Sequence, residues 1–370
     1  MDKKLHQKYQ ELQKRVQTFL GYPCSAEFSY DELFRFLHFP LNNVGDPWGT
    51  SNYQMNTHEF EREVIQYFAH FYASDIDYWG YVTNGGSEGN LCGLWMGMQC
   101  HPKAVVYYSK HSHYSVPKAV QLTRSEAIEI PVDGIGEIDY VALEKAMQVH
   151  RDRPAIMMAN IGTTMTGAID DVHRIKQIFK KLNIDQYYIH CDCALHGLIL
   201  PYTNSKKRFQ LSDIHSLAIS GHKFIGCPIP CGIFLTHKHI IDQQKNYIEY
   251  VHIHDCTITG SRNAITPLML WAVLMGKGHA NWQVQVQTCL RNTHYAVEQM
   301  RKHHIDAWAN ADSTIVVFPK PSEAVVRKWQ LACYEGIAHI VVMRHVDQPM
   351  LDRFIDDMVK DRTSSLAVKA

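Results

Sequence analysis

Apolar residues recur along the first twenty positions at alternating spacings of four and three, on an otherwise charged background. This spacing predicts an amphipathic helix, and the helix should stop at residues 21–23 because glycine and proline disfavour its continuation. A lone amphipathic helix needs a surface to lie on. The alternatives are packing on its own chain and acting as an arm that clasps a partner subunit. The apolar stripe consists of Leu5, Tyr9, Leu12, Val16 and Phe19.

From about residue 52 to about residue 256, helical periodicities alternate with short apolar runs. This alternation predicts an α/β fold, in which a mostly parallel sheet is sandwiched by helices. Ligands bind such sheets beyond the carboxyl ends of the strands, so the residues that follow each run are candidate site residues. The apolar runs occupy residues 104–108, 127–130, 155–159, 187–189, 216–219 and 232–235.

The last part of the chain has a different order of elements. A long helical stretch follows residue 266, and strand-like runs at 314–318 and 340–343 have helices between and after them. This order predicts a small C-terminal α+β domain. The predicted organisation is an N-terminal helical arm at residues 1–51, a large domain at 52–265 and the small domain at 266–370.

Composition and charge narrow the class of partner. The chain has 37 lysines and arginines against 37 aspartates and glutamates, which removes the bulk attraction to nucleic acids and anionic membranes and favours a small-molecule ligand. No apolar stretch approaches the ~20 residues of a membrane span, and the N-terminus lacks the apolar core of a secretory signal. The sequence therefore predicts a cytoplasmic protein, and its ten cysteines are expected to be reduced thiols.

Two of the strand ends carry complementary chemistry. Lys223 follows the run at 216–219, and Asp192 follows the run at 187–189. Enzymes that use pyridoxal 5'-phosphate (PLP) need an amine that holds the cofactor's aldehyde as a Schiff base. They also need a carboxylate that keeps the pyridine nitrogen protonated, so that the ring can accept electrons. Lys223 and Asp192 are our candidates for these two roles.

Residues 81–90 form a glycine-rich segment that leads from a short strand into a helix. The glycines allow close backbone approach, Ser87 is expected to cap the helix, and the free N–H groups of the first turn favour an anion. An ordinary glycine turn with a serine cap has the same pattern. The segment is therefore a candidate phosphate site whose function depends on its neighbours.

The histidines and cysteines around Asp192 raise the alternative of a zinc site. Their spacing matches no finger or ribbon, and strand alternation puts His190 and Asp192 on one face and Cys191 and Cys193 on the other. We therefore expect no bound metal and expect the two thiols to pack in the core.

Three polar residues near the strand ends have open roles. His113 follows the run at 104–108, where an imidazole could stack on a flat cofactor. Ser220 and His222 flank Lys223, where they could reach a phosphate or simply satisfy a turn.

Taken together, these motifs resemble the group II PLP-dependent amino-acid decarboxylases, in particular the short bacterial histidine decarboxylases and the plant serine decarboxylases. The resemblance implies the PLP-dependent transferase fold type I. It also implies a homodimer with active sites at the subunit interface, in which residues 259–261 reach a neighbouring site. The matching motifs lie at residues 21–23, 42–46, 81–90, 160–171, 190–197, 220–232, 259–263 and 314–319.

The resemblance also implies a role for each site residue. Lys223 would form the Schiff base, Asp192 would pair with the pyridinium nitrogen, and His113 would stack on one face of the ring. Ala194 would pack beneath the other face, and Thr164 would lie near the phenolic oxygen. The residues that would hold the phosphate are Gly86, Ser87, Ser220 and His222.

The motifs divide between two substrates. Residues 84–87 and 317–319 look like the histidine enzymes, whereas residues 46–48 and 223–227 look like the serine enzymes. Both relatives usually carry Gly-His where this chain has Ala264-Ile265. We expect decarboxylation of L-histidine to histamine, because the short bacterial enzymes are the better-populated functional class, and L-serine to ethanolamine is the alternative.

Two other classes of protein fit parts of the pattern. A PLP transaminase or lyase would also use Lys223 and Asp192, but only a decarboxylase releases CO₂ and an amine. A non-catalytic metal-binding protein would be colourless and hold zinc, whereas a PLP protein is yellow. For the proton that replaces CO₂ on Cα, Tyr247 and Tyr250 are the candidate donors.

Overall fold

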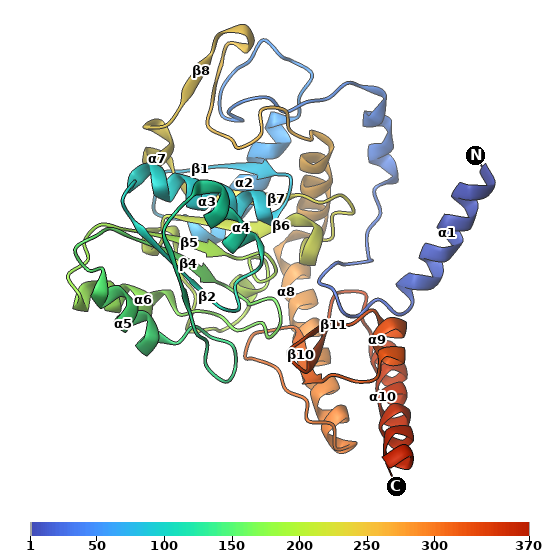
Figure 1. Ribbon diagram of the computed structural model, residues 1–370. Helices are drawn as coiled ribbons and strands as arrows, with labels where there is room; N and C mark the ends of the chain where they lie inside the picture. Colours follow the sequence, from blue (N-terminus) through green and yellow to red (C-terminus); the bar gives the residue numbers. More distant parts are fainter. Residues whose placement is uncertain (1, 370) are drawn as a thin grey trace.

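A seven-stranded sheet forms the centre of the computed structural model, which describes residues 2–369 (Figure 1). In spatial order the strands are β1 (Tyr78–Thr83), β7 (Gly232–His237), β6 (Ser216–Ser220), β5 (Tyr187–Asp192), β4 (Ala155–Asn160), β2 (Val105–Ser109) and β3 (Ala127–Ile130). The strands from β6 to β3 are parallel, whereas β7 is antiparallel to both β6 and β1. The predicted runs and the mostly parallel sheet are thus confirmed.

Each face of the sheet has its own apolar core. On one face, α3 (Gly86–Cys100) and α4 (Ser115–Thr123) cover a cluster that includes Tyr188 and Phe234. On the other face, a larger cluster that includes Ile189 and Cys191 packs against α2 (His58–Tyr72), α5 (Tyr140–Val149) and α6 (Val172–Lys181). Successive residues of β5 therefore point to opposite faces, as strand geometry requires.

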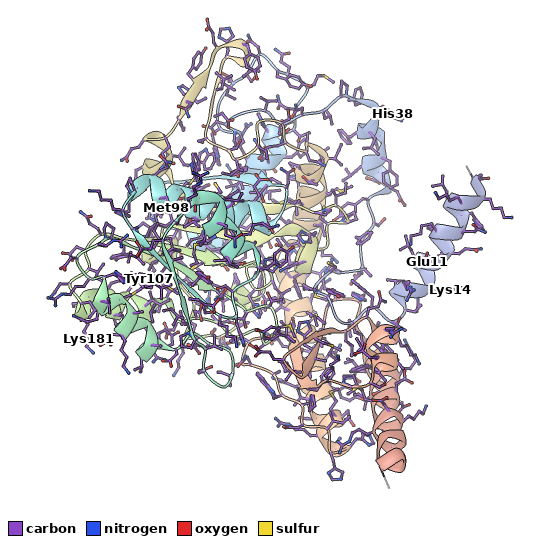
Figure 2. All side chains as sticks on the ribbon, in the orientation of Figure 1. Glu11, Lys14, His38, Met98, Tyr107 and Lys181 are labelled. Atoms are coloured by element: carbon purple, nitrogen blue, oxygen red, sulfur yellow. The ribbon has the colours of Figure 1, made fainter. Side chains whose placement is uncertain are left out.

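The helix at the N-terminus, α1 (Asp2–Val16), contacts the rest of its own chain at its last turn, where the Gln330 side chain donates to the Arg15 carbonyl oxygen at 2.8 Å. None of its residues is buried, and it projects from the body of the molecule (Figure 1). Leu5, Tyr9 and Leu12 are 64%, 62% and 54% exposed, and the charged side chains of Glu11 and Lys14 lie on the same helix (Figure 2). Packing on its own chain is therefore limited to the end of the helix, and the arm alternative stays a prediction.

The C-terminal part contains a three-stranded antiparallel sheet of β10 (Ile315–Pro319), β12 (Ile337–Val341) and β11 (Ala332–Tyr334). The helices α9 (Glu323–Trp329) and α10 (Gln348–Lys369) follow its strands, and α8 (Ile265–Lys302) contacts both α2 and α10. This arrangement confirms the α+β pattern, whereas the domain limits stay a prediction. The remaining regular elements are η1 (Asp31–His38), η2 (Leu200–Tyr202), η3 (Leu211–Asp213), η4 (Gly221–Ile225), α7 (Lys238–Asp242), β8 (Asn246–Ile248), η5 (Glu249–Val251) and β9 (Ile253–Asp255).

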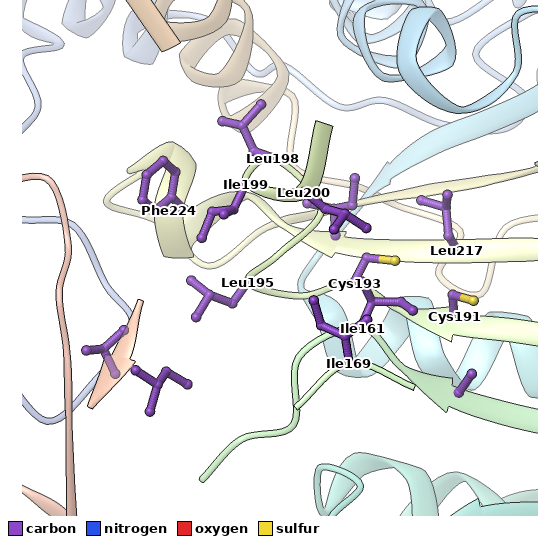
Figure 3. Packing of buried hydrophobic residues seen from close by; sticks show 14 of the residues in the cluster. Ile161, Ile169, Cys191, Cys193, Leu195, Leu198, Ile199, Leu200, Leu217 and Phe224 are labelled. Atoms are coloured by element: carbon purple, nitrogen blue, oxygen red, sulfur yellow. The ribbon is translucent and has the colours of Figure 1, made fainter. Parts of the chain in front are cut away.

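Apolar packing holds the strand ends in place. Leu195 and Phe224 lie in the core beyond the ends of β5 and β6, on the side of Cys193 away from Leu217 (Figure 3). Cys191 and Cys193 are fully buried in this core, which confirms their predicted packing role. Within residues 2–369, no helix is long and apolar enough to cross a membrane.

Candidate active site

A cavity of about 90 Å³ lies beyond the carboxyl ends of β4 and β5. Its opposite wall comes from the small C-terminal sheet and from the segment that follows α1. Of the predicted site residues, five line this cavity: His113, Thr164, Asp192, Ala194 and Lys223. The opposite wall is formed by Gly21, Tyr22, Pro23, Ile315, Ala332 and His339.

Lys223 sits on a tight turn that directly follows β6. The turn spans Gly221–Ile225, and Lys223 has non-helical backbone angles of φ −88° and ψ −115°. Phe224 and Ile225 are 1% exposed and anchor the turn in the core. Burial lowers the pKa of the Lys223 ammonium, although the negative charge of Asp192 acts in the opposite direction. A lowered pKa increases the neutral fraction of the amine, which is the form that attacks an aldehyde.

Asp192 is a buried carboxylate whose charge interacts with the Lys223 ammonium without direct contact. Its Oδ1 accepts a hydrogen bond from the Ala194 N–H at 3.0 Å, and its Oδ2 accepts one from the Asn90 side-chain N–H at 2.7 Å. Within residues 2–369 it forms no ion pair shorter than 4.0 Å. A buried negative charge at a cavity wall is costly unless a cation enters the cavity. This donor set therefore fits the protonated pyridine nitrogen of PLP.

His113 lies four residues beyond the end of β2. Its Nδ1 is 2.8 Å from the Ser115 Oγ, and burial lowers its pKa in spite of the nearby Asp192 charge. The imidazole is therefore mostly neutral near pH 7. A neutral, partly buried ring at the cavity wall can stack on a flat aromatic ligand.

The predicted phosphate segment forms the N-terminus of α3, but not in the expected way. The helix begins at Gly86 with Gly85 as its N-cap and with no side-chain cap, so the expectation that Ser87 caps the helix is wrong. A Cβ at residue 86 would lie 2.6 Å from the Ser220 Oγ. Glycine therefore lets the first turn of the helix approach Ser220. The N–H groups of the first turn and this hydroxyl form a cradle that fits an anion such as the PLP phosphate.

His222 is held by the backbone of a neighbouring turn. Its Nδ1 is 3.0 Å from the Cys231 carbonyl oxygen. His222, Gly86, Ser87 and Ser220 do not line the 90 Å³ cavity, although Gly86 lies next to Ala194, which does. Their role toward the phosphate stays a prediction.

Sequence reasoning missed two polar residues at this site. Asn90 binds Asp192, and His339 of β12 lines the cavity with its Nδ1 3.0 Å from the Met165 carbonyl oxygen and its Nε2 3.1 Å from the Gly21 carbonyl oxygen. A signal exists for His339, because it interrupts an apolar strand. For Asn90 the sequence signal is its spacing of four residues from Gly86, because residues four apart lie on the same face of a helix.

Other predicted residues lie elsewhere in the chain. Thr259 is 3.1 Å from Asn84 of its own chain, so its reach to a neighbouring site stays a prediction. Tyr247 and Tyr250 are 54% and 84% exposed and do not line the cavity. In the part of the chain that the structure describes, no three histidine, cysteine, aspartate or glutamate residues are grouped as metal ligands.

Comparisons with known proteins place this site in context. Residues 94–319 match the pyridoxal-dependent decarboxylase conserved domain. The chain is 44% identical to the histidine decarboxylase of Morganella morganii over 348 residues, which are 92% of each protein. It is 40% identical to serine decarboxylase 1 of Oryza sativa subsp. japonica over 357 residues, 95% of this chain and 74% of that protein. The L-methionine decarboxylase of Streptomyces sp. 590 superimposes with a TM-score of 0.91 at 24% identity, over 97% of this chain and 95% of that one.

Proposed function

Because the chain belongs to the pyridoxal-dependent decarboxylase family, we propose that it converts L-histidine to histamine and CO₂. The family membership makes it a PLP-dependent amino-acid decarboxylase. The superposition on the methionine enzyme confirms fold type I. The identity of the amino acid is the proposal.

The choice of histidine rests on sequence identity to the relatives. Identity to the Morganella histidine decarboxylase is 44%, against 40% to the rice serine decarboxylase. The higher identity supports histidine, and serine is the second candidate because its enzyme matches 95% of this chain.

The residues of the site have distinct tasks in this proposal. When bound, PLP supplies a conjugated ring that accepts the electron pair left behind as CO₂ departs. Lys223 would supply the amine that holds the cofactor's aldehyde. Asp192 would keep the ring nitrogen protonated, which would stabilise the transition state more than the ground state. His113 would stack on one face of the ring.

Two groups of residues complete the proposed site around these three. Gly86, Ser87, Ser220 and His222 would hold the phosphate. Ala194 would support the ring from below, and Thr164 would lie near its phenolic oxygen.

We further propose that the active unit is a homodimer. An apolar groove lies between η1 and the start of α8, and three large side chains of this region, Phe28, Phe34 and Leu37, are 47%, 54% and 62% exposed. The exposed stripe of α1 is a second apolar surface without cover in one chain. A second copy would bury both and would let residues 259–261 approach the neighbouring site. Analytical ultracentrifugation should show a dimer at micromolar concentration, and a monomer under these conditions would contradict it.

The proton that replaces CO₂ on Cα would come from Tyr247 or Tyr250. Both phenols are exposed on their own chain, which leaves them accessible to a site in a second copy, although the Tyr247 hydroxyl is 2.8 Å from the His252 Nδ1. Phenylalanine at the correct position should lower turnover, and unchanged turnover in both variants would remove these candidates.

The product of the reaction tests the proposed substrate directly. PLP-reconstituted protein is incubated separately with each of the twenty amino acids, and CO₂ and amine are measured. Histamine as the dominant product supports the proposal. Ethanolamine would move the chain to serine, and a keto acid without CO₂ would indicate transamination.

A further inference from the structure

A chain of buried polar side chains runs behind Asp192, between the sheet and α3. The Asn90 Nδ2 is 2.7 Å from the Asp192 Oδ2, and the Asn90 Oδ1 is 3.0 Å from the His190 Nε2. The Ser216 Oγ lies 2.8 Å from the His190 Nδ1 and 3.0 Å from the Tyr188 hydroxyl. Apart from Asp192, at 9%, none of these residues is more than 1% exposed.

A glycine of α3, Gly93, makes room for the imidazole of His190. Strand alternation puts Tyr188, His190 and Asp192 on the face of β5 that α3 covers. A Cβ at residue 93 of α3 would lie 2.1 Å from the His190 Nδ1. Glycine at this position therefore lets the helix pack directly on the imidazole.

The hydrogen bonds between these buried polar side chains have one consistent direction. Because the Asp192 carboxylate only accepts, Asn90 must point its NH₂ group toward it and its carbonyl oxygen toward His190. The His190 Nε2 must then carry a proton. Burial lowers the pKa of His190 to about 4, so the ring is neutral near pH 7 and its Nδ1 accepts from Ser216. The oxygen of Ser216 in turn accepts from the Tyr188 hydroxyl.

Asn90 also connects to the second site residue. Its Nδ2 lies 3.0 Å from the Ser115 Oγ, which lies 2.8 Å from the His113 Nδ1. The Ser115 oxygen accepts from Asn90, which leaves the hydroxyl proton of Ser115 for the His113 Nδ1, and the Ser115 backbone N–H donates to the same Nδ1 at 3.3 Å. The proton of the neutral His113 ring is therefore on Nε2.

We propose that Asn90 is a positioning residue for the decarboxylation, which holds Asp192 as a hydrogen-bond acceptor and His113 as its Nε2–H tautomer. His190, Ser216 and Tyr188 keep the Asn90 amide in this orientation. A free amide could flip and turn its carbonyl oxygen toward the carboxylate, which would replace an attraction by a repulsion. The proposal rests on the proposed function of the site and adds the residues that set its proton arrangement.

Substitutions along this series of hydrogen-bonded side chains give a graded test in the PLP-reconstituted enzyme. Asn90→Asp keeps the shape and the acceptor for His190 but puts a second acceptor against Asp192. We expect kcat to fall about 10- to 100-fold, the value of a hydrogen bond to a charged group, with a smaller change in KM. His190→Leu should have an intermediate effect. Tyr188→Phe changes the residue of this series that is farthest from Asp192, and it should change kcat less than about threefold.

Two further variants separate this role from loss of packing. His190→Gln can donate to Asn90 and accept from Ser216, so it should recover most of the kcat lost in His190→Leu. Tyr107→Phe changes a tyrosine that is 1% exposed and belongs to the core on the opposite face of the sheet, and it should leave kcat unchanged. Melting temperatures of all variants report stability separately.

A measurement without cofactor tests the proton arrangement itself. Nitrogen-15 NMR of histidine-labelled apoprotein should show His113 and His190 as Nε2–H tautomers near pH 7, with each resonance assigned by its loss in His113→Gln or His190→Gln. Asn90→Asp should shift the His113 tautomer toward a mixture. If Asn90→Asp does not fold, the His190→Leu and His190→Gln pair decides by the same criteria.

The outcomes separate this inference from the proposed function. An unchanged His113 tautomer together with kcat within twofold of wild type in Asn90→Asp would overturn the inference, as would equal kcat in the two His190 variants. If the wild-type protein binds PLP but releases no CO₂ from any amino acid, the proposed function fails, and the tautomers of the apoprotein still decide the role of Asn90.

Discussion

Two of the buried carboxylates, Glu61 and Asp192, are treated in opposite ways. Glu61 of α2 pairs with Arg262, and the two side chains are 0% and 1% exposed. Glu61 also accepts hydrogen bonds from the Val82 N–H at 2.8 Å and from the Asn43 side chain at 2.7 Å. Its charge is therefore balanced within the chain, as a structural ion pair requires.

Asp192 has two hydrogen-bond donors but no cation within 4.0 Å in the part of the chain that the structure describes. Unlike Glu61, it borders a cavity. The same kind of side chain therefore serves two purposes in this molecule. A carboxylate paired within the chain stabilises the fold, whereas one without a cation at a cavity wall is available to a cationic ligand. Substitutions at the two places should therefore affect different properties.

Removal of the site's amine should produce the largest effect. Lys223→Ala leaves nothing to bind the cofactor's aldehyde, so we expect turnover below detection and loss of the visible absorbance of bound PLP. Lys176→Ala is the control, because this lysine pairs with Asp213 away from the cavity. A retained absorbance band in Lys223→Ala would place the bond to the cofactor on another lysine.

Removal of the unpaired carboxylate should come next. Asp192→Ala should lower kcat on the order of 10³-fold even with PLP bound, since it removes a charge that acts mainly in the transition state. Steady-state CO₂ release at saturating PLP measures this change. Turnover near that of the wild type would show that Asp192 has no such role.

The paired carboxylate should behave in the reverse way. Glu61→Gln leaves Arg262 buried without its partner, so we expect the free energy of unfolding to fall by about 3–5 kcal/mol. The kcat of the protein that remains folded should stay within about threefold of wild type. Urea unfolding measures the stability, and kcat is measured at urea concentrations below the unfolding transition. A large loss of kcat at unchanged stability would contradict the comparison.

A third buried group sharpens the comparison because it has neither a partner nor a place at the cavity. His196 is fully buried, and within residues 2–369 neither ring nitrogen has a hydrogen-bond partner. Burial lowers its pKa to about 4 from 6.5, so the unfolded chain binds more protons between these pH values. The wild type therefore loses stability as the pH falls from about 6.5 to about 4.

His196→Leu removes the unsatisfied ring. We expect the free energy of unfolding at pH 7 to rise by about 1–3 kcal/mol, and the advantage of the variant to grow at pH 5. Urea unfolding at both pH values measures it. A variant that is less stable than the wild type at both pH values would show that His196 has a partner, such as a bound water.

The sequence was sufficient for the residues whose position depends on local rules. Lys223 and Asp192 follow apolar strands directly, and the ends of parallel strands meet at one edge of a sheet. Ser87 was misjudged because the helix begins one residue before it, with a glycine as its N-cap. Asn90 and His339 leave only weak local signals, and their roles depend on contacts with segments that are distant in the sequence. For the same reason, the exposure of α1 could not be predicted.

The most direct test of the contrast is the free energy of unfolding of the apoprotein for the isosteric variant Asp192→Asn, measured beside Glu61→Gln. We expect Asp192→Asn to change stability by no more than about 1.5 kcal/mol, the net value of one hydrogen bond, while Glu61→Gln loses about 3–5 kcal/mol. A loss for Asp192→Asn as large as that for Glu61→Gln would mean that Asp192 is balanced within the chain, and would contradict its assignment as the carboxylate kept for the cofactor.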